Sequence, residues 1–416
     1  MPVIKPFKAF RPEPELVTKV ASPPYDVLNS EEARQLVKDN PYSFLHVNKA
    51  EIDLESSVDH YDQRVYEKAS ENLNKLIKGR VYLQDEEEKI YIYRQIMKGR
   101  AQTGLVVCVS IDDYLNRKIK KHENTREDKE KDRVNHINFT NANTGPVFLT
   151  YKAKDEIKQI VNRWTKEEKP VYDFTSEDEI THTCWVIDDK SIIQQLIKSF
   201  AAVDYLYIAD GHHRAAAATK VGLKRREQLK DYTGKEEFNY FLSVLFPHDE
   251  LHIMDYNRVV ADLAGNSEEE FIRKISEKFT VEKNIGGRPY RPKARHTFGM
   301  YLDNRWYKLT AKSGTFDEDD AVESLDVSIL QNNLLTPILG IKDPRTDQRI
   351  EFVGGIRGLE ELEKRVKAGM KVAFSLYPTS IEELMKVADA EKLMPPKSTW
   401  FEPKLRSGIF IHKLSE

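Results

Sequence analysis

The residues with the clearest chemical potential form one short run in the middle of the chain. An apolar segment, Leu206 to Ala209, leads into Asp210-Gly211-His212-His213-Arg214, and an alanine-rich segment follows. This order predicts a strand that turns at Asp210-Gly211 into the first turn of a helix. The backbone N–H groups of such a turn have no partner within the helix and lie at the positive end of the helix dipole, so they suit a phosphate group.

The side chains of this run add to the case for a phosphate. Arg214 offers a fork-shaped pair of donors, and Gly211 can adopt a positive φ that lets a ligand approach the chain closely. Asp210 can cap the helix or hold a metal ion. A plain helix start would explain Asp210-Gly211 alone, but it does not explain two adjacent histidines and an arginine. The sequence therefore predicts a phosphate-binding turn formed by Gly211, His212, His213 and Arg214.

A second candidate is the polar loop that contains His122-Glu123-Asn124-Thr125. It differs from the His-Glu-x-x-His helix of zinc proteases, because Arg126 stands where the second histidine ligand would be. Glu123 can act as a general base for a hydroxyl group near a bound phosphate. Taken alone, however, this glutamate is better explained as one more charge on a solvated face.

A third candidate is Pro396-Lys397-Ser398-Thr399, near the end of the chain. Lysine supplies a point charge for a phosphate, and the two hydroxyl groups supply hydrogen bonds. Loops of this composition are common, so the segment is weak evidence by itself.

These motifs lie among alternating helix and strand patterns. Apolar residues at four-residue steps predict a helix over 60–78, with Tyr61, Val65, Ala69 and Leu73 on one face. A further helix is predicted to open at Ser30 with Glu31 and Glu32 in its first turn, and others cover 156–165, 191–200, 328–339, 359–368 and 380–388. The predicted strands cover 43–47, 90–97, 104–111, 147–151, 181–187, 203–209, 350–353 and 371–377. This alternation predicts a mixed α/β fold.

The length and the charge pattern predict how the chain is divided. A chain of 416 residues implies about two or three compact units at roughly 150 residues per unit. We place them at 1–100, 101–285 and 286–416, with a Gly- and Pro-rich flexible connection at 286–293. Between Arg117 and Arg133, opposite charges recur at helical spacing, which predicts a solvent-facing helix.

The composition narrows the class of protein. With 40% apolar and 32% charged residues and no apolar run of membrane-spanning length, the sequence predicts a soluble protein that does not bind membranes. The start lacks the pattern of a secretory signal, and Cys108 and Cys184 lie in strand-like segments, so we expect buried thiols and a cytoplasmic location. The 65 basic and 68 acidic side chains give a net charge of -3, which disfavours nucleic acid as the default partner.

Together, the three motifs resemble those of the archaeal ADP-dependent free serine kinases, which have the ParB/sulfiredoxin fold and phosphorylate L-serine to O-phosphoserine. That family has a His-Glu pair, an Asp-Gly-His-His-Arg turn and a Pro-Lys-Thr-Thr segment in this order. The counterparts here are His122-Glu123, Asp210 to Arg214 and Pro396 to Thr399. Trp400-Phe401 stands where the kinases have Arg-His.

The whole chain also resembles a large bacterial ParB-like family of unknown function. The shared signatures are Pro-Pro-Tyr-Asp-Val at 23–27, His-Glu-x-Thr at 122–125, Asp-Gly-His-His-Arg at 210–214 and Lys-Ser-Thr-x-Phe at 397–401. The resemblance implies a ParB/sulfiredoxin-like nucleotide-binding core in residues 101–285. An added amino-terminal α/β region and a carboxy-terminal α/β unit, whose Pro-Lys-Ser-Thr segment completes the site, would flank this core.

The resemblance implies nucleotide-dependent phosphoryl transfer on a small amino acid, with free L-serine and O-phosphoserine interconverted in either direction. It implies Mg²⁺ and a nucleotide donor, ADP or ATP, with CTP left open. The implied catalytic residues are Glu123, His122 and Asp210, and Asp210 is also the candidate Mg²⁺ ligand. The implied phosphate-binding residues beyond the turn are Lys397, Ser398 and Thr399, and the implied substrate-binding residues are Asn124, Thr125 and Trp400.

Three alternatives belong to other classes. Sulfiredoxin chemistry needs a cysteine where His212 stands, so it is disfavoured. A ParB-like clamp on DNA should carry a helix-turn-helix with a basic face, and the sequence has no convincing example. A nucleotide-binding regulatory or sensor protein without turnover stays open, and so does assembly into homo-oligomers.

Overall fold

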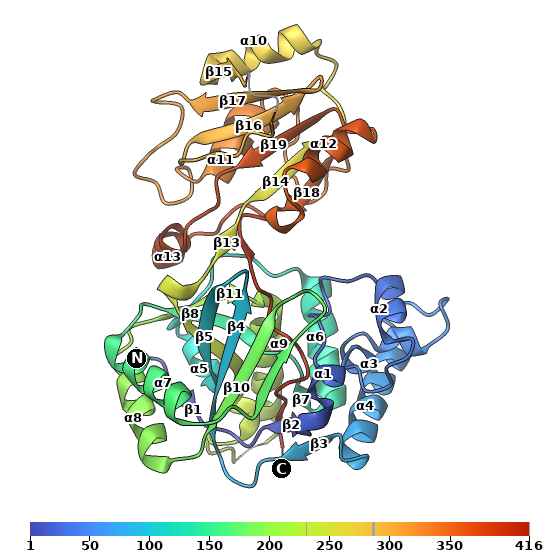
Figure 1. Cartoon of the computed structure of the whole chain (residues 1–416), viewed down its shortest axis with the longest axis vertical. Coiled ribbons are helices and arrows are strands. Elements are labelled where there is room, and N and C mark those ends of the chain that lie inside the picture. Colours follow the sequence, from blue (N-terminus) through green and yellow to red (C-terminus); the bar gives the residue numbers. More distant parts are fainter. Residues whose placement is uncertain (230, 285–287, 416) are drawn as a thin grey trace. The chain divides into compact units, whose positions relative to one another are not determined.

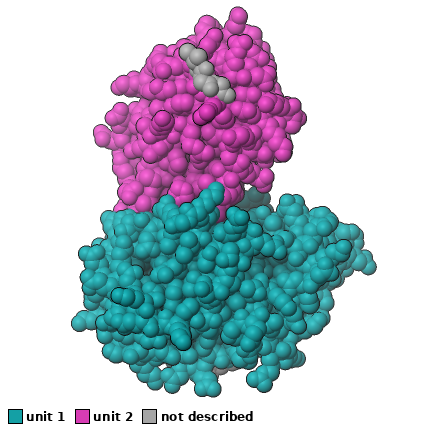
Figure 2. Space-filling model, viewed as in Figure 1, with its two compact units in different colours: residues 1–251, 403–416 teal, residues 252–402 magenta. Residues whose placement is uncertain are grey.

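The computed structural model describes residues 1–229, 231–284 and 288–415, and their contacts divide into two compact units (Figure 2). Unit 1 contains residues 1–251 and 403–416, and unit 2 contains residues 252–402. The predicted boundary between residues 100 and 101 falls inside a strand of unit 1. The predicted boundary between residues 285 and 286, with the start of the connection at 286–293, lies outside the described residues.

Unit 1 is built on a nine-stranded mixed sheet (Figure 1). In sheet order its strands are β6 (Ile119–Lys120), β11 (Leu206–Asp210), β8 (Val147–Tyr151), β12 (Tyr240–Pro247), β5 (Arg100–Ser110), β4 (Ile90–Met97), β10 (Thr181–Ile187) and β9 (Tyr172–Thr175), while β1 (Ile4–Lys5) pairs with β5. The β6–β11 and β8–β12 pairs are parallel, and the remaining pairs are antiparallel. Every residue of β8 is buried, as expected for a strand covered on both faces.

Unit 1 also contains helices. They are α1 (Val17–Val20), α2 (Ser30–Val37), α3 (Leu45–Asn48), α4 (Gln63–Lys78), α5 (Ile111–Leu115), α6 (Glu127–Thr140), α7 (Asp155–Glu167), α8 (Lys190–Phe200) and α9 (His212–Gln228). Some lie beside this sheet, and others, such as α2 and α3, pack on other helices. Helix α9 contacts α6, β8 and β12, and α6 also contacts α4. The small side chains Ala215 and Ala217 are fully buried, so they allow α9 to approach its neighbours closely.

The last residues of the chain complete unit 1. The pair β21 (His412–Lys413) and β7 (Ala142–Asn143) is antiparallel, and the hydroxyl of Tyr82 donates to the carbonyl of Gly408 at 2.6 Å. Ile411 is fully buried in a cluster with Val20 and Phe44. These contacts place residues 403–415 in the core of the unit that also contains the amino terminus.

Unit 2 is built on a six-stranded antiparallel sheet. In sheet order its strands are β15 (Phe279–Lys283), β17 (Arg305–Ala311), β16 (Thr297–Leu302), β19 (Val372–Leu376), β14 (Tyr256–Val260) and β18 (Ile350–Gly354). Its helices are α10 (Glu268–Lys278), α11 (Asp326–Leu330), α12 (Glu360–Lys367) and α13 (Ile381–Asp389). A short antiparallel pair joins β13 (Ile253–Met254) to β20 (Trp400–Phe401).

The predicted mixed α/β fold is confirmed, but two local predictions are wrong. Residues 43–47, predicted as a strand, belong to a helical turn that includes α3. The charged stretch 117–133 was expected to form a solvent-facing helix. The helix α6 begins only at Glu127, and Asp132 and Arg133 of the stretch are buried in this helix, which packs against α4 and α9. Burial is tolerated because Arg133 pairs with Asp132 at 2.7 Å and Asp132 also accepts from the Tyr66 hydroxyl.

Both cysteines, Cys108 and Cys184, are buried and unpaired, as the sequence predicted. Among the described helices, none has the length and apolar character that a membrane crossing requires.

Candidate functional site

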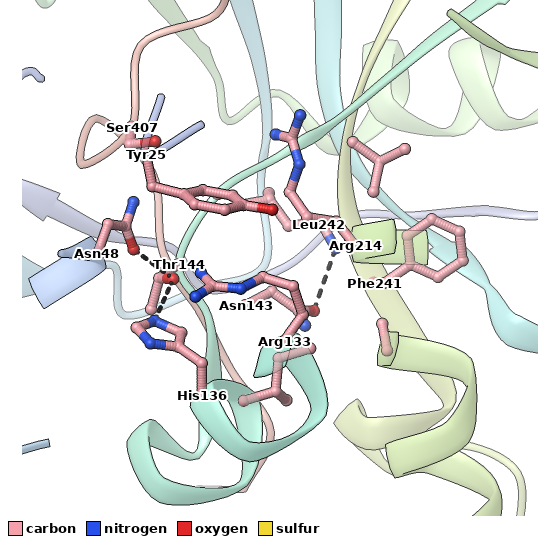
Figure 3. Close-up of a pocket in the computed structure, with 14 residues that line it drawn as sticks. Tyr25, Asn48, Arg133, His136, Asn143, Thr144, Arg214, Phe241, Leu242 and Ser407 are labelled. Atoms are coloured by element: carbon pink, nitrogen blue, oxygen red, sulfur yellow. Dashed lines mark hydrogen bonds between the residues drawn. The ribbon is translucent and has the colours of Figure 1, made fainter. Parts of the chain in front are cut away.

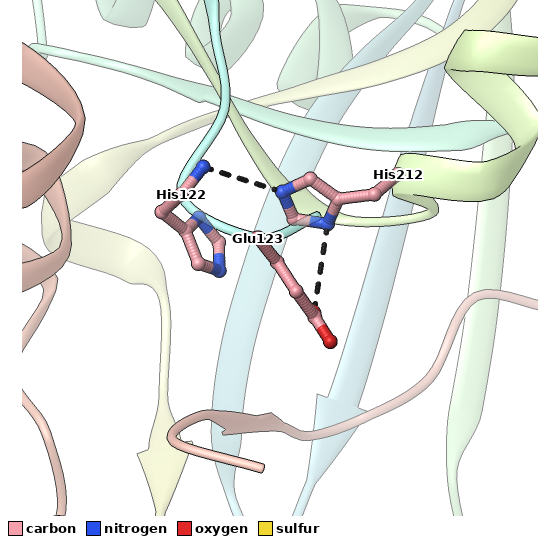
Figure 4. Close-up of side chains that lie close together, drawn as sticks. All are labelled: His122, Glu123 and His212. Atoms are coloured by element: carbon pink, nitrogen blue, oxygen red, sulfur yellow. Dashed lines mark hydrogen bonds and ion pairs between the residues drawn. The ribbon is translucent and has the colours of Figure 1, made fainter. Parts of the chain in front are cut away.

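Two parallel strands bring the central turn and the His-Glu loop together. In the β6–β11 pair, Ile119 lies opposite Leu206 and Lys120 lies opposite Tyr207. Because parallel strands point the same way, the segments that follow them leave the sheet in the same direction. His122 and Glu123 therefore meet His212, the first residue of α9 (Figure 4).

The predicted strand, turn and helix start are present at the central turn. Strand β11 ends at Asp210, Gly211 occupies the N-cap position with φ 95° and ψ 31°, and α9 begins at His212. A glycine suits this left-handed conformation, which L-residues with a Cβ rarely adopt. No side chain caps the helix start, so Asp210 is not the helix cap that the sequence allowed. The N–H groups of the first turn are thus available to a ligand.

Arg214 folds back over this turn. Its Nη1 donates to the carbonyl oxygen of Pro146, and its Nη2 lies 3.4 Å from Asp210 Oδ2. A Cβ placed on Gly211 would meet the Arg214 guanidinium at 3.0 Å. The residue at 211 must therefore be small for Arg214 to keep this position beside the helix start.

Asp210 is the anionic centre of the turn. Its Oδ2 is 3.5 Å from Lys404 Nζ as well as 3.4 Å from Arg214. Burial raises the pKa of Asp210, but the cations Lys404 and Arg214 outweigh burial and hold it below its ordinary value. The carboxylate is therefore ionised at neutral pH, and one of its oxygens is already shared by two cations.

The three side chains of the His-Glu loop and the helix start form a compact cluster. The rings of His122 and His212 are perpendicular, with centroids 4.5 Å apart, and His212 Nδ1 lies 3.9 Å from Glu123 Oε2. The backbone N–H of His122 donates to His212 Nε2 at 3.5 Å. Only 6% of the His212 side chain is exposed, against 46% for Glu123. Glu123 thus reaches solvent from beside a buried imidazole.

Each of these three residues has a possible metal-ligand atom, and these atoms all lie within 4.8 Å of one another, close enough to bind one metal ion. A neutral imidazole has one nitrogen that accepts and one that carries a proton. Since His212 Nε2 accepts from the backbone, its proton resides on Nδ1, which faces Glu123. Nδ1 lies 3.9 Å from Glu123 Oε2, which is an electrostatic contact longer than a hydrogen bond, and with its proton in place Nδ1 is not ready to bind a metal ion.

Both buried histidines of the cluster are electrically neutral at pH 7. Burial lowers the pKa of His122 to about 4, although Asp210 and a backbone hydrogen bond at Ile208 act in the opposite direction. Burial and the neighbouring His122 lower the pKa of His212 well below its ordinary value. The ring of His212 is enclosed by the cluster, so the group it can offer to a phosphate is its backbone N–H.

The end of the loop contacts His213. Its Nε2 accepts from the backbone N–H of Arg126 at 3.0 Å, and burial lowers its pKa. Thr125 is half-buried and donates to Glu130 Oε2 at 2.8 Å, whereas Asn124 is exposed. The structure therefore brings the His-Glu loop and the central turn together within unit 1.

The Lys-Ser-Thr segment belongs to unit 2, where its contacts are local. Lys397 is exposed, with φ 59°, and its carbonyl accepts from Arg258 Nη2 at 2.9 Å. The hydroxyl of Ser398 donates to Pro395 O at 2.6 Å, and Thr379 donates to Ser398 O at 3.0 Å. Trp400 packs on Gly354, where an added Cβ would lie 2.9 Å from the indole ring. Participation of Lys397, Ser398, Thr399 and Trp400 in one site with the turn stays a prediction.

A pocket lined by both polar and apolar side chains lies beside Arg214 in unit 1 (Figure 3). Arg133 and Arg214 both line it, and the Arg133 guanidinium lies 4.0 Å from the centre of the Tyr25 ring. Burial raises the pKa of Tyr25 to about 12, while both arginines act to lower it. Both guanidinium groups are therefore close enough to the Tyr25 side chain in the pocket to influence it electrostatically.

The sequence did not predict that Lys404 pairs with Asp210, or that Arg133 is buried and lines a pocket. Arg133 lies in the charged stretch, whose pattern is that of a solvated face, and Tyr25 lies in the Pro-Pro-Tyr-Asp-Val signature without an assigned role. Lys404 is 194 residues from its partner Asp210, and no local pattern signals such a pair. The signature at 23–27 was the one signal that could have led to the pocket.

Acid is expected to destabilise the fold through His122. The unfolded side chain has a pKa near 6.5 and the folded one about 4, so between these values the unfolded state binds a proton that the folded state does not. The contribution of neutral His122 is therefore complete above about pH 7 and is lost as the pH falls. At pH 5 the loss is about 2 kcal/mol of unfolding free energy.

Urea unfolding at pH 7 and pH 5 measures this effect in the wild type and in His122→Gln. The variant should lose about 2 kcal/mol less than the wild type over this interval. His182, whose pKa burial lowers to about 3, gives both proteins a common background loss. Equal losses in the two proteins would contradict the assignment of the effect to His122.

The comparisons with known proteins place the chain in a family. The sequence profile of DUF1015, a family of proteins of unknown function, matches residues 4–328, and the chain therefore belongs to this family. A search of curated proteins found no match. The family assignment agrees with the resemblance to a family of unknown function.

Several solved structures are similar to the chain. A variant of a free serine kinase in complex with AMP has 14% identity, covers 71% of this chain and 87% of its own, and has a TM-score of 0.37. A conserved hypothetical protein from Pyrococcus furiosus has 14% identity, covers 73% of this chain and 94% of its own, and has a TM-score of 0.35. SbnI from Staphylococcus aureus, truncated at its C-terminus, has 11% identity, covers 73% of this chain and 85% of its own, and has a TM-score of 0.37.

Proposed function

We propose that this protein transfers a phosphoryl group between a nucleotide and the hydroxyl group of a small amino acid, with free L-serine and O-phosphoserine as the acceptor pair. The observation that carries the proposal is the position of Glu123, whose Oε2 lies 3.9 Å from the first side chain of α9, beside an uncapped helix start that holds Arg214. A base beside a phosphate-binding turn is the pairing that phosphoryl transfer needs. The order of the three sequence motifs, which resembles that of the ADP-dependent free serine kinases with their ParB/sulfiredoxin fold, supports the same reaction.

The phosphate end of the site consists of backbone and guanidinium donors. The N–H groups of His212 and His213 and the guanidinium of Arg214 would hold the phosphate oxygens, because these donors surround the helix start. Donors fixed in advance stabilise the charge of the transition state without a cost of reorganisation. Lys397, with the hydroxyls of Ser398 and Thr399, is proposed to add contacts from unit 2.

The acceptor end is proposed to use Glu123. Its carboxylate takes the proton of the serine hydroxyl while the hydroxyl oxygen forms a bond to phosphorus, and the bond from phosphorus to the leaving nucleotide oxygen breaks. In the reverse direction Glu123 returns the proton to serine. The neutral ring of His212 lies beside Glu123 and is proposed to orient it, while Asn124, Thr125 and Trp400 are proposed to contact the amino acid.

Mg²⁺ fits this site through Asp210. Mg²⁺ usually binds one or two protein carboxylates together with phosphate oxygens and water, and Asp210 is an ionised carboxylate next to the turn. Its Oδ2 is shared by Arg214 and Lys404, so Oδ1 is the oxygen left for the ion. Bound Mg²⁺ would neutralise the negative charge of the phosphates.

The proposal is tested with purified protein, Mg²⁺ and L-serine, to which ADP, ATP and CTP are added in turn, and in reverse with O-phosphoserine and AMP or ADP. Phosphoserine that forms only when both serine and a nucleotide are present supports the proposal and identifies the donor. Nucleotide binding without transfer in every combination would contradict it and point to a sensor protein without turnover.

A further inference from the structure

The pocket beside Arg214 has an apolar part, lined by Ile137, Val147, Ala218, Phe241 and Leu242, and a polar part that could hold an anion. Arg133 from α6 and Arg214 from α9 line it, together with the polar side chains of Asn48 and Ser407. None of the lining residues that the structure describes is acidic. An enclosed space with cationic and neutral donors and no carboxylate on its wall attracts an anion and repels a cation.

Arg133 is held in place for such a ligand. Its Nε and Nη2 lie 2.9 and 2.7 Å from the same oxygen, Oδ2 of Asp132, and the Tyr25 ring covers the guanidinium at 4.0 Å (Figure 3). Asp132 is fixed in turn by the Tyr66 hydroxyl at 3.0 Å. The carboxylate therefore occupies one edge of the guanidinium. Nη1 belongs to the other edge, which can donate to a ligand.

Neutral hydrogen bonds organise the part of the lining formed by Asn48, His136 and Thr144. Thr144 donates its hydroxyl hydrogen to Asn48 Oδ1 at 2.8 Å and accepts from His136 Nε2 at 3.0 Å. With its oxygen engaged in this way, the Asn48 amide presents its NH₂ group as a donor. Burial lowers the pKa of His136 well below its ordinary value, so this histidine adds no charge. The charge of the pocket thus comes from its arginines.

The size of the pocket limits what it can hold. It offers about 30 Å³, whereas roughly 10 to 15 Å³ on this measure is enough for one water molecule. A nucleoside does not fit in this volume, but a group of a few oxygen atoms does. We propose that this pocket binds a small oxyanion, a phosphoryl or carboxylate group, which Arg133 contacts from α6 and Asn48 from α3.

Anion binding in this pocket does not require the proposed reaction, although Arg214 both lines the pocket and belongs to the proposed phosphate-binding turn. If the reaction occurs, the oxyanion is a second anionic group of one of the reactants. If it does not, the pocket remains a site for inorganic phosphate or a free acid. The two proposals are therefore separable, because phosphate binding is measured without turnover.

The test is calorimetric titration of the full chain with inorganic phosphate at low salt, in the absence of nucleotide. The wild type should bind about one equivalent of phosphate in this pocket, in addition to any phosphate that binds at the central turn. Asn48→Asp keeps the oxygen that Thr144 contacts but puts a carboxylate on the wall, so it should weaken phosphate binding in the pocket at least about tenfold with the fold retained. Arg133→Gln should weaken it similarly. Arg226→Gln, which removes a guanidinium of α9 outside this pocket, should bind phosphate like the wild type.

The nature of the anion follows from further titrations with acetate, L-serine, O-phosphoserine and ADP. Competition with phosphate by O-phosphoserine or ADP, but not by acetate or serine, identifies a phosphoryl site, and competition by acetate and serine identifies a carboxylate site. Wild-type phosphate binding that both Asn48→Asp and Arg133→Gln retain in full, or no phosphate binding by the wild type, would overturn the proposal.

Discussion

Replacement of Arg214 by alanine is expected to lower kcat/KM for serine-dependent phosphoryl transfer by about 100- to 1,000-fold. The guanidinium lies against Gly211 and beside the uncapped start of α9, and only 13% of the side chain is exposed. Its removal takes the one fork-shaped donor from the proposed phosphate site. Nucleotide affinity should fall together with the rate, because a phosphate contact acts on the bound nucleotide as well as on the transition state.

Arg226→Ala is the matched control for this variant. Arg226 lies near the other end of the same helix, 12% of its side chain is exposed, and it pairs with Asp112 at 2.7 and 2.8 Å. Its loss costs stability but should leave transfer close to the wild-type rate. Arg214→Lys should remain impaired, because an ammonium group does not reproduce the fork that reaches Pro146 and a phosphate together. Equal rates in Arg214→Ala and Arg226→Ala would exclude Arg214 from the site.

The sequence predicted the long regular elements well. Strands 90–97, 147–151 and 181–187 have the predicted bounds, since each is an apolar run of strand length between polar or turn-forming segments. The helix predicted over 60–78 is α4, and it begins at Gln63 because Asp62 caps it by accepting from the backbone N–H of Arg64. Local chemistry was enough for these elements.

Short or composite elements were predicted less well. Residues 43–47 contain Phe44, Leu45 and Val47, all buried, and a short apolar run has the same composition in a strand and in a helical turn. Contact between α3 and α4 decided in favour of the turn, and that contact is tertiary. The predicted helix 328–339 is α11 followed by a π-helical turn at Gln331–Leu335, a change of pitch that an apolar pattern does not show.

In the candidate site, too, some features could be predicted from local sequence and others depend on tertiary contacts. The turn at Asp210-Gly211 was visible because strand, glycine and helix follow one another in the sequence. The Lys404–Asp210 pair depends on the return of the last residues to unit 1, and the burial of Arg133 depends on the packing of α6 against α4 and α9. Both features depend on tertiary packing. In the sequence Arg133 looks like a solvent-exposed charge, but in the structure it pairs with Asp132 and the Tyr25 ring covers it.

Replacement of Glu123 by glutamine is expected to lower kcat for transfer by about 100- to 10,000-fold, the range of general base catalysis. Glutamine keeps the shape and an oxygen that can face His212 Nδ1, but it cannot take a proton at neutral pH. Since 46% of the Glu123 side chain is exposed, the free energy of unfolding should change by no more than about 0.5 kcal/mol. Nucleotide affinity should stay unchanged, which separates this variant from Arg214→Ala.

Glu127→Gln supplies the control, since Glu127 is an exposed carboxylate at the start of α6, four residues further along the chain. It should keep the wild-type rate, so that a loss confined to Glu123→Gln cannot be attributed to the net charge of the segment. Rapid transfer by Glu123→Gln would mean that catalysis depends on phosphate positioning and charge neutralisation alone. The side chain at position 123, which is 46% exposed, would then serve to position the acceptor without a proton transfer.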